Sequence, residues 1–107
     1  MQTIVEKMDE KFPETMKLFQ EINTEQFNLF AMKQHDYGPG NIAMNGDKDL
    51  SLLALAVRMN DKVQRLLNIL HNNKGKTAVN EALVDTFQDL SVYGIIAQIC
   101  LKDKWGK

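Results

Sequence analysis

The stretch from Asn80 to Lys102 constrains the fold more than any other part of this chain. On a helix with about 100° between residues, one of its faces is apolar from end to end. This face comprises Leu83, Phe87, Leu90, Gly94, Ala97 and Leu101. A second stripe, roughly opposite, begins with Glu81, Asp85 and Asp89 and continues as Val92, Ile96 and Ile99. Because a solvated face would stay polar along its whole length, we interpret the second stripe as a packed interface with an acidic end.

Two more long helices are expected before this stretch. Pro13 suits the first turn of a helix, since its missing N–H has no intrahelical partner there, and the amphipathic pattern continues to about Gln34. Asp49 is a good N-cap for the next helix, from Leu50 to about His71. Asn80 is the expected N-cap of the last helix, and residues 1–11 are expected to form a short N-terminal helical segment.

A short polar connection around Gly75 places the last two helices in an antiparallel hairpin. With the turn there, Asp61 and Lys62 face Asp89, and Arg65 faces Asp85 or Thr86. The opposite end of the hairpin is apolar on more than one side, through Leu50, Leu53, Val57, Val92, Ile95, Ile96 and Ile99. The expected fold is therefore all-α, in a single helical domain of residues 1–107. An antiparallel helical hairpin and an N-terminal amphipathic helix form a bundle that is completed by dimerisation.

Composition excludes several classes of function. The net charge of −1 supplies no overall basic field for a long nucleic acid. The longest uncharged run, Leu90–Leu101, is too short to span a bilayer, and the charged N-terminus lacks a signal-peptide core. The lone Cys100 lies among apolar residues, which is typical of a buried thiol in a reducing compartment. We therefore expect a cytoplasmic protein with no membrane partner.

Residues 36–49 are a candidate functional loop, because irregular stretches of about this length in compact domains are often functional. Gly38-Pro39-Gly40 is expected to end the preceding helix. Lys33, Tyr37 and Asn41 would offer a ligand a cation, a stacking ring and an amide. The alternative is a structured connector in which Tyr37 caps the core.

The charged end of the hairpin combines acids with cations. The acids are Asp61, Glu81, Asp85 and Asp89, and the cations are Arg58, Lys62 and Arg65. One interpretation is a network of salt bridges between helices, in which exposed pairs contribute only about 0–1 kcal/mol each. The other is a Mg²⁺ site in which the carboxylates hold the ion and the cations grip phosphate oxygens.

Three segments together resemble the nucleotide modification associated domain, a family of phage and bacterial proteins that lies close to the MazG-type all-α nucleotide pyrophosphatases. The segments are KQHDYGPGN, RMNDKVQRLLNIL and NEALVDTFQDLSVYGIIAQ, and the resemblance spans about Lys33 to Leu101. It implies phage-linked nucleotide metabolism in the host cytoplasm. MazG-type enzymes are Mg²⁺-dependent helical oligomers that cleave nucleoside triphosphates to a monophosphate and pyrophosphate. Their E-x-x-E is absent here, and Thr86 stands where the glutamate of their E-x-x-D is expected.

The resulting hypothesis is a small helical domain that binds a phosphorylated nucleotide with Mg²⁺. Asp85, Asp89, Asp61 and Glu81 are the candidate metal ligands. The candidate phosphate contacts are Lys62, Arg65, Arg58 and Lys33, and those to base or sugar are Tyr37 and Asn41. Pyrophosphohydrolase activity is left open. The alternatives are a non-catalytic phage factor that sequesters a nucleotide or blocks a host protein, and a plain helical interaction module.

Overall fold

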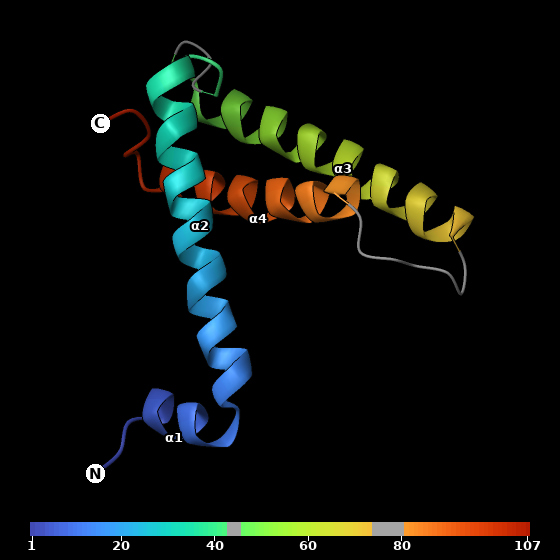
Figure 1. The fold of residues 1–107 in the computed structure, drawn as a ribbon. Helices are drawn as coiled ribbons and strands as arrows, with labels where there is room; N and C mark the ends of the chain where they lie inside the picture. The colour runs from blue at the N-terminus through green and yellow to red at the C-terminus, as the bar shows by residue number, and fades with distance from the viewer. Residues whose placement is uncertain (43–45, 74–80) are drawn as a thin grey trace. The chain divides into compact units, whose positions relative to one another are not determined.

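The computed structural model describes residues 1–42, 46–73 and 81–107. Over these ranges the chain forms four helices and no strand, which confirms the all-α prediction (Figure 1). The helices are α1 (Ile4–Lys11), α2 (Pro13–Tyr37), α3 (Lys48–Asn72) and α4 (Glu81–Leu101). The chain divides into two compact units, Met1–His35 and Asp36–Lys107, which are described separately below.

The first unit contains α1 and most of α2. Thr3 caps α1 with its side-chain oxygen, which accepts a hydrogen bond from the Glu6 backbone N–H at 3.1 Å. The Glu6 carboxylate accepts one in return from the Thr3 N–H at 3.4 Å, which completes a capping box. Pro13 opens α2 as expected, and the helix continues past Gln34 to Tyr37. Gly38 follows with a φ of 68°, a left-handed conformation that favours glycine after a helix.

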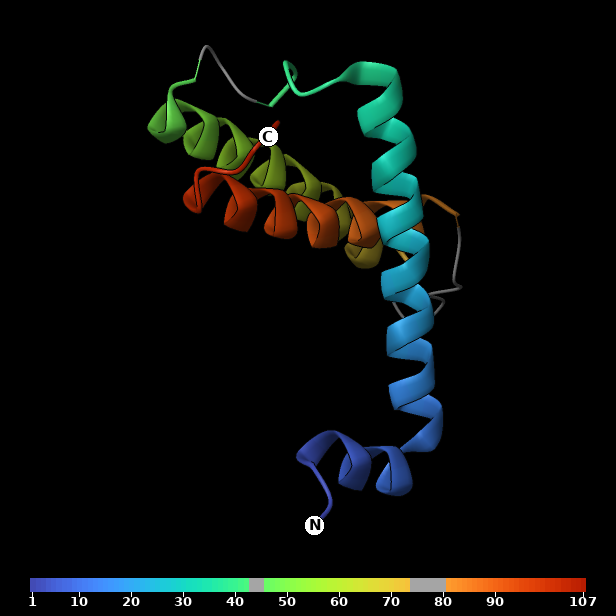
Figure 2. The same cartoon turned by 90° about the vertical axis from the view of Figure 1, so that its left-hand side faces the viewer.

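In the second unit, α3 and α4 pack against each other along much of their length. They lie side by side and run in opposite directions (Figures 1 and 2). The buried residues on α3 are Ser51, Leu55 and Leu66, and those on α4 are Leu83, Thr86, Ile96 and Cys100. The expected turn of the hairpin and the expected N-cap Asn80 lie in residues 74–80, outside the described residues.

The buried face of α4 differs from the face that the sequence predicted. Phe87 and Leu101, both assigned to the apolar face, are 52% and 58% exposed. Thr86 and Cys100, which lay outside it, are only 1% and 6% exposed, so the buried stripe is rotated by roughly a quarter turn. Because α4 is apolar on more than one side, its periodicity cannot locate the centre of the interface. Thr86 tolerates burial because its hydroxyl donates to the Ala82 carbonyl at 2.6 Å.

The N-cap of α3 is Asp47, whereas the sequence predicted Asp49. Its Oδ1 accepts a hydrogen bond from the Leu50 N–H at 3.0 Å, and its carbonyl accepts from the N–H and the hydroxyl of Ser51 at 2.9 and 2.8 Å. Asp49 lies in the first turn instead, so the helix begins at Lys48. Either aspartate is chemically suited to be a cap. The extended backbone at Asp47, with φ −80° and ψ 103°, decides between them.

The chain after α4 folds back as an ordered tail. Asp103 has a φ of 57°, the Asp103 N–H donates to the Cys100 carbonyl at 3.0 Å, and the Lys104 N–H donates to the Ile99 carbonyl at 3.2 Å. This pattern is a Schellman motif that ends the helix with an aspartate at the usual glycine position. Trp105 then donates from Nε1 to the Pro39 carbonyl at 3.0 Å, which ties the tail to the segment before α3. Among the described helices, none combines the length and apolar character needed to cross a membrane.

Candidate functional site

An ion pair joins α3 to α4 at the charged end of the two helices. The Lys62 Nζ lies 2.9 Å from Asp89 Oδ2, and the two side chains are 27% and 29% exposed. The predicted proximity of Lys62 to Asp89 is therefore confirmed. A pair that is mostly shielded but still reached by solvent interacts more strongly than a surface pair, and it remains accessible to a ligand.

The other three predicted metal ligands, Asp61, Glu81 and Asp85, have exposed side chains. Among the described residues, no group of three or more His, Cys, Asp or Glu side chains comes close enough together to hold a metal ion. The four carboxylates therefore do not form a preassembled metal cage. Asp89 has a lysine as its partner, so its charge is already compensated in this structure.

Arg58 and Asn41, assigned to phosphate and to base or sugar, are brought together by a direct hydrogen bond. The Arg58 Nη2 donates to the Asn41 backbone carbonyl at 2.9 Å. This contact anchors the segment before α3 to the third turn of that helix. It uses one of the five N–H donors of the guanidinium. The sequence placed both residues near a ligand, but it did not predict that they would bind each other.

The remaining predicted ligand contacts are exposed. Arg65 is exposed on α3, one turn beyond Lys62. Tyr37 is 70% exposed, so the alternative in which its ring caps the core is wrong. Lys33 is exposed and belongs to the first unit.

The Gly38–Ile42 segment is an ordered turn. The Ile42 N–H donates to the Pro39 carbonyl at 3.2 Å, and the Ile42 side chain is only 4% exposed. The same Pro39 carbonyl accepts the Trp105 indole N–H, while Arg58 holds Asn41. Side chains from α3 and from the tail thus fix the backbone of this segment on both sides.

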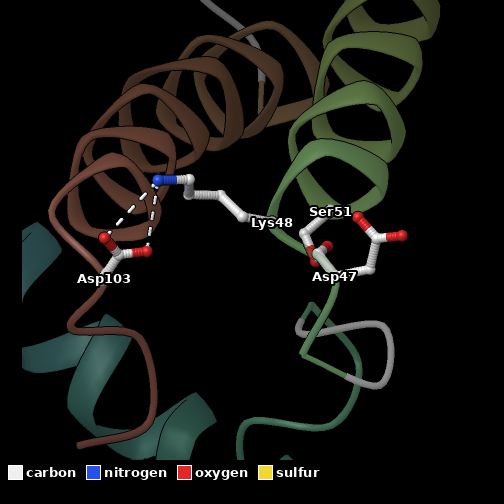
Figure 3. Close-up of polar contacts among 4 residues, drawn as sticks. All are labelled: Asp47, Lys48, Ser51 and Asp103. Atoms are coloured by element: carbon white, nitrogen blue, oxygen red, sulfur yellow. Dashed lines mark hydrogen bonds and ion pairs between the residues drawn. The ribbon is translucent and has the colours of Figure 1, made fainter.

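Sequence reasoning missed a cavity of about 200 Å³ between the start of α3 and the tail after α4. It is lined by Gly46, Lys48, Ser51, Cys100, Asp103, Trp105 and Lys107. At its exposed edge, the Lys48 ammonium lies 3.3 Å and 3.5 Å from the two Asp103 carboxylate oxygens (Figure 3). Burial raises the pKa of the Cys100 thiol above its usual 9.0, so this part of the wall is uncharged at neutral pH. The only sequence signal was a tryptophan and an aspartate just past the last apolar helix.

These features define an all-helical domain with an interhelical ion pair, a row of cations beside it and a separate small cavity. The family model described as Nucleotide modification associated domain 1 matches residues 33–101, and the chain belongs to that family. The match covers α3 and α4 and stops before the tail that carries Asp103 and Trp105. No curated protein and no solved structure matches the chain.

Proposed function

We propose that this chain is a helical nucleotide-handling domain that binds the phosphates of a nucleotide at the charged end of α3 and α4. The observation that carries the proposal is the partly exposed Lys62–Asp89 pair at the junction of the two helices. It places a cation and a carboxylate side by side in a family whose description concerns nucleotide modification.

The cations of α3 support a phosphate-binding row. Arg58, Lys62 and Arg65 follow one another at spacings of four and three residues, so they are neighbours on one face of the helix. An ammonium has three donors, and a single carboxylate partner leaves capacity for phosphate oxygens. Exposed Arg65 would bind phosphate in a bidentate fork, which a lysine cannot form.

Magnesium enters this proposal together with the nucleotide. Asp85 and Asp89 lie one turn apart on α4, and Mg²⁺ is often held by one or two carboxylates plus substrate phosphates. Asp61 and Glu81 would then act as outer carboxylates. When bound, the ion would neutralise charge on the phosphates. Because the described carboxylates form no three-ligand group, we expect Mg²⁺ to bind weakly in the absence of nucleotide.

The proposal is tested by calorimetry and thermal shift with nucleoside mono-, di- and triphosphates, each with and without Mg²⁺. A ligand at about 100 times its Kd stabilises the fold by about 2.7 kcal/mol. Lys62→Met, which keeps the stem and removes the charge, should weaken binding by about tenfold or more, the value of one charge-assisted hydrogen bond. The matched control is Lys17→Met, which removes a lysine that also has a carboxylate partner but is 79% exposed on α2.

Absence of heat and of thermal shift with every nucleotide would refute the proposal. If a nucleotide binds, pyrophosphate release then separates a MazG-like pyrophosphohydrolase from a protein that only sequesters its ligand. Equal nucleotide affinity of Lys62→Met and wild type would show that the phosphates do not bind at Lys62.

We also propose that the α3–α4 pair is a hairpin and that a second copy of the chain covers it. Among the described residues of α3 and α4, five apolar side chains are more than half exposed, and they belong to Leu53, Val57, Leu67, Phe87 and Leu101. Burying one such side chain fully contributes about 1.5–3 kcal/mol, so a homodimer that covered them would gain substantially. Of the residues predicted for this interface, Ile96 is instead buried within the chain at 5% exposure. Sedimentation of a monomer at tens of micromolar would contradict the dimer.

A further inference from the structure

We propose that Trp105, in the tail after α4, is a positioning residue for Arg58 in the phosphate-binding row. The two side chains hold the Gly38–Ile42 segment through two of its backbone carbonyls. The inference rests on the proposed function, and it adds to the phosphate site a residue that touches no phosphate. It also gives a role to the tail, which lies beyond residues 33–101 that the family model matches.

The turn around Pro39 connects the two hydrogen bonds. Trp105 donates from Nε1 to the Pro39 carbonyl at 3.0 Å. Two residues further on, the Asn41 carbonyl accepts from Arg58 Nη2 at 2.9 Å. The Ile42 N–H closes the turn by donating to the same Pro39 carbonyl at 3.2 Å, and the Ile42 side chain is only 4% exposed. Because this turn is short and anchored at its end, a shift of the Pro39 carbonyl also moves the Asn41 carbonyl that holds Arg58.

The tail holds the indole beside this turn. Asp103 has a left-handed φ of 57° in the Schellman motif, and its carboxylate lies 3.3 Å from the Lys48 ammonium (Figure 3). Gly106, with a φ of 73°, passes so close to the turn that an added Cβ would lie 3.1 Å from the Pro39 Cβ. Trp105 therefore lies between two anchored residues, and the tail backbone limits the movement of its ring.

A guanidinium that is already held binds phosphate at a lower entropic cost. A long side chain loses rotamer freedom when it grips a phosphate, and preorganisation removes part of that loss. Arg58 is half-buried, and it lies one turn before Lys62 on the same face of α3. Because a guanidinium has five N–H donors, Arg58 can hold the Asn41 carbonyl and still donate to phosphate oxygens. Loss of the Trp105 hydrogen bond should therefore free Arg58 and weaken phosphate binding.

The first measurement uses no ligand. The chain contains one tryptophan and two arginines, Arg58 and Arg65, so the NMR signals of the indole N–H and of each arginine Nε are readily assigned. Trp105→Phe keeps an aromatic ring but removes the indole N–H. Gly106→Ala disturbs the close approach of the tail to the turn and leaves the indole intact. The matched control is Lys102→Met, which changes an exposed lysine in the same part of the chain.

We expect Trp105→Phe to speed hydrogen exchange of the Ile42 amide by about tenfold, since the turn loses one of its hydrogen bonds. The Arg58 Nε should become as mobile as that of exposed Arg65, whose own mobility should not change. The glycine variant should have the same two effects, and the lysine variant should have neither. Unchanged circular dichroism should show that the helices remain formed in each variant.

The second measurement is the calorimetric affinity for inorganic triphosphate and for the common nucleoside triphosphates, each with Mg²⁺. Trp105→Phe should weaken binding by about threefold to tenfold, the cost of ordering one long side chain. It should add no further loss in an Arg58→Met background, because the side chain that it positions is gone. In a Lys62→Met background the two losses should multiply. A tail that only stabilises the fold would instead lower the affinity by the same factor in both backgrounds.

The two proposals fail separately. Equal Ile42 exchange and equal Arg58 mobility in wild type and both tail variants would refute the positioning role, whether or not a triphosphate binds. An equal loss of affinity on Trp105→Phe in both backgrounds would also refute it. If the tail variants free Arg58 but no triphosphate binds to wild type, the phosphate site is refuted, and the positioning of Arg58 by Trp105 stands.

Discussion

The Lys62–Asp89 pair offers a direct test of how the α3–α4 interface is held together. The perturbation is a double-mutant cycle of Lys62→Met, Asp89→Asn and the two combined. Methionine keeps most of the lysine stem, and asparagine keeps the volume of the aspartate while removing its charge. The cycle isolates the pairwise term from the effect of each substitution alone.

The magnitude follows from the burial of the pair. Exposed pairs contribute about 0–1 kcal/mol, whereas removal of one partner from a buried pair costs about 3–5 kcal/mol. With side chains that are 27% and 29% exposed, the single substitutions should each lower the free energy of unfolding by about 1–2 kcal/mol. For a domain of this size that is a fall in Tm of roughly 5–15 °C. The double variant should be no less stable than either single one, because no unpaired charge remains.

The matched control is the Lys17–Glu21 pair of α2, a contact of 3.9 Å with side chains that are 79% and 53% exposed. Its cycle, with Lys17→Met and Glu21→Gln, should give a coupling below about 0.5 kcal/mol that disappears in high salt. Urea unfolding followed by circular dichroism measures both cycles. Equal coupling in the two pairs would refute the argument that burial strengthens the interhelical contact.

Two further outcomes follow from local structure. Asp47→Ala should lower the free energy of unfolding, measured by urea titration, by about 1 kcal/mol, because Asp47 is the N-cap of α3. Asp49→Ala should lower it by only a few tenths of a kcal/mol. A larger loss for Asp49→Ala than for Asp47→Ala would contradict the assignment of the cap. Burial raises the pKa of Cys100 above 9.0, so the unfolded thiol ionises first as pH rises and folding then loses stability. The free energy of unfolding of wild type should therefore exceed that of Cys100→Ala by a constant amount below pH 9.0. Above pH 9.0 this difference should decrease by at most about 1.4 kcal/mol per pH unit. A constant difference from pH 7 to pH 10 would show that the thiol is not desolvated.

Parts of the candidate site were predictable from the sequence because they depend on helix geometry. Lys62 faces Asp89 since both lie at predictable distances from a short connection between two helices. The contacts that hold the Gly38–Ile42 segment were not predictable. The hydrogen bonds from Arg58 to Asn41 and from Trp105 to Pro39 join residues that are far apart in the sequence, and no local pattern encodes them.

Local sequence signals specify the helices. Apolar spacing, Pro13, the capping box at Thr3 and the glycines after Tyr37 each act within a few residues, and the resulting helices fall close to the expected bounds. Which side of each helix is buried depends instead on packing between helices. Because α4 is apolar on more than one face, only packing against α3 selects Thr86 and Cys100 for the interior and leaves Phe87 outside. Packing also forms the cavity, since its walls come from the start of α3 and from the tail after α4, which are far apart in the sequence.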